Sequence, residues 1–126
     1  MIELANSEKE RAIAVGLVTH KVTRRQAEEY LEELTLLADT AGAIVIHKIL
    51  QERQGIDSTF YIGKGKVEQL KQLAEDEEIS LLIFDDDLSP AQLRNLENQI
   101  KRKMGPEPTP AAWLVRSAPG RVVALP

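Results

Sequence analysis

Cysteine is absent from this chain of 126 residues, and histidine occurs only twice, as His20 and His47. Disulfide bonds and classical zinc fingers are therefore excluded. The apolar runs fall far short of the ~20 residues that a membrane-spanning helix needs. The N-terminal residues also lack the basic region of a secretion signal. These absences lead us to expect a cytoplasmic protein without a membrane partner.

The charge of the chain is moderate and acidic. It has 16 basic and 20 acidic side chains, which give a formal net charge of -4, and 43% of its residues are hydrophobic. A chain of this length can bury a core of its own as one small domain. The acidic balance argues against a general polyanion binder, so affinity for nucleic acid would have to come from a local basic patch.

The composition shifts towards the C-terminus, where five of the six prolines lie at or after position 106. We therefore divide the chain into an N-terminal extension (1–9), an α/β domain (10–103) and a Pro/Ala-rich tail (104–126) that we expect to be mobile. No strand is recognisable in the tail. At most one of its two apolar clusters, 113–115 or 122–125, is expected to add an edge strand to the domain.

Short apolar runs alternate with segments of helical period inside the domain. Strands are expected at 11–18, 43–50 and 80–85, each followed by a helix. This βαβαβα order predicts a small three-layer α/β domain with a mostly parallel sheet. The carboxyl ends of the strands would gather His20, Lys21, the 51–66 loop and the 85–89 segment at one edge, where ligands of open α/β sheets usually bind.

The ends of the expected helices carry capping signals. Thr23 with Gln26, and Ser89 with Gln92, fit the capping box, and Gly42 stands just after the first helix. Pro90 occupies a first helical position, where its missing N–H does no harm. The apolar stripe of the first helix is expected to comprise Ala27, Tyr30, Leu31, Leu34, Leu37, Ala38 and Ala41.

The densest chemical signal is the segment TFYIGKGKVEQL at 59–70. Its glycines and lysines stand where a helix begins, and the free N–H groups and the dipole of a helix N-terminus favour phosphate. Phe60 and Tyr61 could stack on a base of single-stranded RNA. In the alternative interpretation the glycines only shape a tight turn and the lysines are solvated. The RNA or phosphate contacts that we predict are Tyr61, Gly63, Lys64, Gly65, Lys66 and Arg94.

The known nucleotide-binding motifs are not completed in the printed sequence. The P-loop string GxxxxGK[ST] does not occur, and GxGxxG fails because Glu68 stands in place of the third glycine. We therefore predict no catalytic residue, no cofactor and no metal, and we do not expect the chain to be an enzyme.

Three consecutive carboxylates, Asp85 to Asp87, follow the third expected strand. Alternate side chains of an extended stretch point the same way, so Asp85 and Asp87 could converge on magnesium or accept a phosphoryl group. The favoured alternative is that they cap the next turn and helix beside Ser89.

Further basic residues flank the expected helices. Lys21, Arg24 and Arg25 lie near the start of the first helix, and residues 101–103 end the third. These residues would form one positive face only if they lay on the same face of the domain as Lys64 and Lys66. Otherwise they are scattered surface charge.

Several strings taken together resemble a known family. ERAIAVGL, LEELTLLADTAGA, TFYIGKGKVEQLKQL and, above all, LLIFDDDLSPAQLRNLENQI are similar to the N-terminal domain of the HflX family of ribosome-associated GTPases, over about residues 10–101. The resemblance implies a cytosolic protein whose partner is the large ribosomal subunit. In the family, this domain contacts ribosomal RNA and restrains the GTPase domain.

The sequence departs from the family after the third helix. The family continues with a further strand, a basic helical hairpin and a GTPase domain, whereas this chain ends in KMGPEPTPAAWLVRSAPGRVVALP. A truncated or frameshifted relative and a natural stand-alone domain are both open. We expect a non-catalytic module that binds the ribosome or its RNA. The alternative is a regulatory domain that acts on a GTPase partner, in trans, without RNA contact.

Overall fold

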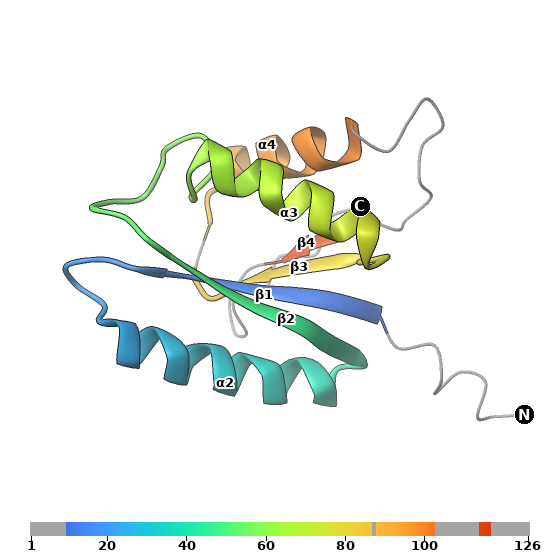
Figure 1. Cartoon of the computed structure of the whole chain (residues 1–126), viewed down its shortest axis with the longest axis horizontal. Coiled ribbons are helices and arrows are strands. Elements are labelled where there is room, and N and C mark those ends of the chain that lie inside the picture. Colours follow the sequence, from blue (N-terminus) through green and yellow to red (C-terminus); the bar gives the residue numbers. More distant parts are fainter. Residues whose placement is uncertain (1–9, 87, 103–113, 117–126) are drawn as a thin grey trace, which may run out of the picture.

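The structure, a computed structural model, describes residues 10–86, 88–102 and 114–116 (Figure 1). The elements in order are β1 (Glu10–Val18), α2 (Arg24–Thr40), β2 (Ala43–Glu52), α3 (Lys64–Asp76), β3 (Leu81–Phe84), α4 (Pro90–Arg102) and β4 (Leu114–Arg116).

The strands form one parallel sheet in the order β2-β1-β3-β4. Helix α2 covers one face of the sheet, whereas α3 and α4 lie together on the other face (Figure 1). The predicted three-layer α/β architecture is therefore confirmed. None of the helices in the described ranges is long and apolar enough to cross a membrane.

Two apolar layers hold the sheet between its helices. Ile13, Val15, Leu82 and Phe84 pack under α3 and α4, while Ala12, Ala14, Leu81 and Ile83 face the side of α2. Burial on both faces explains why β1 and β3 read as continuous apolar runs. The α2 stripe was only partly right: Ala27, Leu31, Leu34 and Ala38 are buried, whereas Tyr30, Leu37 and Ala41 are exposed. The reason is that α2 packs mainly on β1 and β2.

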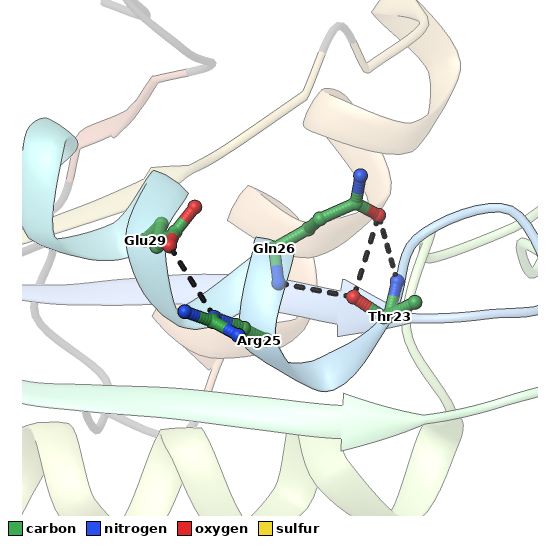
Figure 2. A network of polar contacts seen from close by, with 4 residues as sticks. All are labelled: Thr23, Arg25, Gln26 and Glu29. Atoms are coloured by element: carbon green, nitrogen blue, oxygen red, sulfur yellow. Dashed lines mark hydrogen bonds and ion pairs between the residues drawn. The ribbon is translucent and has the colours of Figure 1, made fainter.

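The expected helix ends are confirmed in detail. The Gln26 N–H donates to Thr23 Oγ1 (3.1 Å), and the Thr23 N–H donates to Gln26 Oε1 (3.0 Å), which completes a capping box (Figure 2). Ser89 and Gln92 exchange the equivalent bonds at 3.1 and 2.8 Å. Gly42 has a φ of 97°, a left-handed conformation that favours glycine directly after a helix.

Strand β2 runs two residues further than its sequence predicts. Gln51 and Glu52 were expected to open a polar loop, but they pair with Leu17 and Val18 of β1. Polar residues are tolerated there because β2 is an edge strand.

Strand β4 lies in the tail segment. It pairs in parallel with β3, so that Leu81 stands opposite Leu114. Leu114 and Val115 of the 113–115 cluster therefore lie in an edge strand, as we expected at most one tail cluster to do, although no strand was recognisable there from the pattern. The second cluster, 122–125, lies outside the described residues.

Candidate functional site

The candidate site is the segment between β2 and α3, together with the start of α3. It lies at the carboxyl ends of the strands, where the segments that follow β1 and β3 also emerge (Figure 1). The edge that the sequence predicted as a binding edge thus brings three connecting segments to one end of the sheet.

A compact turn around Asp57 shapes this segment. Asp57 Oδ1 accepts the N–H groups of Thr59 and Phe60, each at 2.8 Å. Asp57 and Tyr61 also exchange backbone hydrogen bonds of 3.1 and 2.8 Å. The N–H of Phe60, and then that of Thr59, hold the pKa of the Asp57 carboxyl below its ordinary value. The turn is therefore stabilised by the ionised carboxylate.

Helix α4 ties this turn to the body of the domain. Gln92 Nε2 donates to the Asp57 carbonyl at 2.8 Å, and Asn95 Nδ2 donates to the Thr59 carbonyl at 3.1 Å. Gln92 is buried and also belongs to the capping box of α4. Sequence reasoning assigned these two side chains no part in the site, because their partners lie 35 and 36 residues away. They fix the segment to helix α4.

Tyr61 has a structural role that differs from our prediction. Its side chain is only 3% exposed, its hydroxyl donates to Asp86 Oδ2 at 2.8 Å, and its ring meets the ring of Phe84 edge-on at 5.7 Å. Burial, together with the Asp86 carboxylate, raises the pKa of Tyr61 far above its ordinary value, so the hydroxyl remains a donor. Stacking of a base on this ring, which the sequence suggested, is therefore incorrect for this structure.

The backbone of Tyr61 is also unusual. Its φ is 73°, in the left-handed region that a bulky residue rarely adopts. Strain of this kind persists only where surrounding contacts enforce it, and it is concentrated at functional sites. The Asp57 and Asp86 contacts are what enforce it here.

The start of α3 presents the predicted phosphate contacts. Gly63 is the N-cap residue, and its N–H donates to Gln51 Oε1 at 2.9 Å. Gly63 is buried, and a Cβ there would lie 2.8 Å from Arg53 Nη1, the end of a flexible side chain that would have to move aside. Lys64 and Gly65 are exposed and Lys66 is half-buried. As a glycine, the N-cap residue itself makes no side-chain cap hydrogen bond.

The basic residues divide between the two faces of the sheet. Arg94 is exposed on α4, which packs beside α3. Arg24 and Arg25 lie on α2, across the sheet, where they pair with Glu52 (3.5 Å) and Glu29 (3.8 Å; Figure 2). The positive face that would have joined both groups is therefore not formed. The side chains of residues 101–103 lie outside the described part of the chain.

The predicted acidic cluster is only partly described. Asp85 and Asp86 are half-buried, whereas Asp87 lies outside the described residues. Within the described ranges, no group of three or more His, Cys, Asp or Glu side chains is arranged to hold a metal ion. The contact of Asp86 with Tyr61 gives this carboxylate a structural role.

A family model and several curated proteins match this chain. The family model, described as GTP-binding GTPase N-terminal, matches residues 28–105. The chain belongs to this family. It is 43% identical over 104 residues to the GTPase HflX of Caldanaerobacter subterraneus and 40% identical over 104 residues to that of Lacrimispora saccharolytica, each alignment covering 82% of the chain. The GTPase HflX of Flavobacterium psychrophilum is 33% identical, again over 82% of the chain. The predicted resemblance to the HflX N-terminal domain is confirmed.

The chain matches only part of each relative. It spans 23%, 24% and 25% of the length of these three proteins. It is thus a GTPase-associated domain, and the match does not extend over the remaining three quarters of the relatives.

Proposed function

We propose that this HflX-type domain is a non-catalytic module that binds the large ribosomal subunit through its RNA. The contacts would be made by Lys64, Gly65, Lys66 and Arg94, whereas the buried Gly63 only begins the helix before them. In this proposal the domain acts in the cytoplasm and needs no cofactor.

The observation that supports this proposal is the exposed start of α3. Two lysines flank Gly65 there, and a Cβ at Gly65 would meet nothing within 4 Å. A phosphate can therefore approach the N–H groups of the first turn, while the helix dipole and the two ammonium groups stabilise its charge. The ties from α4 hold this surface in place before RNA arrives, which lowers the entropy lost on binding.

The test is co-sedimentation of the purified chain with large ribosomal subunits. Lys64→Glu combined with Lys66→Glu should abolish co-sedimentation and change the free energy of unfolding by less than about 1 kcal/mol, because Lys64 is exposed and Lys66 is partly exposed. The matched control is Arg24→Glu combined with Arg25→Glu, which changes the charge equally on the other face of the sheet. Unchanged co-sedimentation of the lysine variant would refute the proposal.

Salt dependence tests the mechanism separately. Lys64, Lys66 and Arg94 can together neutralise about three phosphates. A plot of the logarithm of affinity against the logarithm of salt concentration should therefore have a slope of about -2 to -3.

A second candidate function is the binding of a GTPase domain, in cis or in trans, without RNA contact. The observation that favours it is the edge strand β2, whose Ile44 is 45% exposed. A mostly apolar contact of this kind should respond little to salt, which distinguishes it from the first candidate. Restraint of a GTPase domain would require this contact.

A further inference from the structure

A cleft lies at the point where the sheet changes direction. Strand β1 leads into α2 on one face, whereas its parallel neighbour β3 leads into α4 on the other face. The segments that follow these two strands therefore diverge, and crevices of this kind are the usual ligand sites of open α/β sheets. Here the crevice is a cavity of about 420 Å³, lined by Leu17 and Thr19 from the end of β1 and by Asp85 and Asp86 from the end of β3. That volume falls within the range of small-molecule sites.

The rim of this cleft is apolar and exposed. Tyr30 of α2 and Ile56 of the β2–α3 segment both line it, and they are 42% and 55% exposed. Large exposed apolar side chains at the mouth of a cavity provide the surfaces between which a flat ring can lie. The cleft therefore suits a planar ligand.

The polar groups of the cleft are of two kinds. The carboxylates of Asp85 and Asp86 are acceptors, and a carboxylate has about four acceptor positions, so it can accept a ligand donor in addition to the partners it has within the protein. Tyr61, which also lines the cleft, orients Asp86 by donating its hydroxyl to Asp86 Oδ2. The exposed ammonium group of Lys21 is a donor in the same lining. A matching ligand must offer adjacent donors on one edge and acceptors on another.

Guanine has this arrangement. Its N1–H and its N2 amino group are neighbouring donors that one carboxylate can accept together, and its O6 and N7 atoms are acceptors for an ammonium group. Adenine presents an acceptor, N1, beside its amino group, which would meet the carboxylate unfavourably. Uracil presents two carbonyl oxygens and a single donor between them.

We propose that the cleft binds the base of an unpaired guanosine, with Asp85 or Asp86 on its Watson–Crick edge, Lys21 on its acceptor edge and Tyr30 against its ring. The proposal rests on the RNA-binding function proposed above, because Tyr61, which lines the cleft, lies only a few residues before the phosphate contacts at Lys64 to Lys66. A free guanosine nucleotide offers the same base, so the experiment must distinguish the two sources.

The experiment measures binding of the full chain to single-stranded RNA hexamers by fluorescence anisotropy. The hexamers are all adenosine, or adenosine with one central guanosine or one central inosine, which lacks the N2 amino group. The guanosine hexamer should bind about tenfold more tightly than the adenosine hexamer, with most of that gain lost for inosine. One of the two variants Asp85→Asn and Asp86→Asn should remove the preference, and a preference kept in both would overturn the proposal. Tyr30→Ala, a change at an exposed residue that does not threaten folding, should also remove it. Glu33→Gln on the exposed face of α2 removes the same charge and should keep the preference.

The outcomes separate this proposal from the proposed function. Binding of all hexamers with equal affinity, lost in the Lys64 and Lys66 double variant, would overturn the guanine site and leave the RNA-binding function standing. If no hexamer binds, co-sedimentation with large ribosomal subunits decides the RNA-binding function, and the cleft is tested by titrating the chain with guanosine and with adenosine while amide chemical shifts are recorded. Shifts at Tyr30, Asp85 and Asp86 with guanosine alone would support the cleft as a site for the free nucleoside. Absence of those shifts would overturn the guanine site.

Discussion

Replacing Gly65 by alanine should raise stability and weaken RNA binding at the same time. Gly65 is the second residue of α3, and an added Cβ meets no atom within 4 Å. Glycine in a helix is less favourable than alanine by about 0.5–1 kcal/mol, because it loses more backbone freedom on folding. With nothing to offset the gain, Gly65→Ala should raise the melting temperature by about 2–6 °C.

The same methyl group would stand where a phosphate must approach the first turn of α3. We expect RNA affinity to fall about tenfold, which is the effect of losing one hydrogen bond to a charged group. Gly55→Ala is the matched control, because a Cβ there also meets nothing within 4 Å and Gly55 is outside the helices. It should leave RNA affinity unchanged.

Thermal unfolding by circular dichroism and hexamer binding by anisotropy measure the two effects on the same samples. A lower melting temperature for Gly65→Ala would refute the expectation that the added methyl group meets no other atom. A higher melting temperature with unchanged RNA affinity would refute the placement of a phosphate over the start of α3.

Two further predictions concern the side chains that fix the site. Tyr61→Phe should lower the free energy of unfolding by about 1–3 kcal/mol at neutral pH, because Asp86 loses its buried donor. The pKa of Tyr61 is raised in the folded state, so its contribution is intact below the ordinary tyrosine pKa near 10 and falls as the pH rises above that value. Urea unfolding between pH 7 and 11 should therefore show a steeper alkaline loss for the original chain than for Tyr61→Phe, and equal slopes would contradict this reasoning. Gln92→Ala should destabilise the fold more than Gln26→Ala does, because both residues complete capping boxes but Gln92 also holds the 53–62 segment. Only Gln92→Ala should weaken RNA binding, and equal effects of the two variants in urea unfolding and anisotropy would show that this hold is unimportant.

Local sequence signals predicted most of the fold. The capping boxes at Thr23 and Ser89 and the left-handed Gly42 depend on residues within four positions of one another, so the sequence shows them directly. Strands β1 and β3 were equally visible, since burial on both faces leaves a continuous apolar run. Strand β4 was not, because its three residues gain their place only by pairing with β3.

The contacts of the candidate site were less predictable, because they join residues that lie far apart in the sequence. The GKGK string marked the start of α3 correctly, but nothing near Tyr61 in the sequence indicates that its hydroxyl meets a carboxylate 25 residues away. An aromatic residue beside lysines is a reasonable stacking candidate until its burial is known. Gln92 and Asn95 carry no chemical signal of their own, because amide side chains are common on helices. Only the packing of α4 beside α3 gives them a role.

The acidic character of the domain constrains how it could recognise RNA. A formal charge of -4 repels RNA at long range, and the exposed cations at the start of α3 are too few to hold RNA by charge alone. Affinity for RNA would then depend on a small loss of conformational entropy on binding and on contacts with the bases, more than on the number of lysines. Helix α4 contributes to the low entropy loss, because Gln92 and Asn95 hold the segment before α3 in place. The turn that leads into α4 contributes to the base contacts, because it carries the carboxylates of Asp85 and Asp86 in the cleft. A change in the first turns of α4 would therefore alter affinity and base preference together, although α4 would supply only Arg94 as a direct phosphate contact.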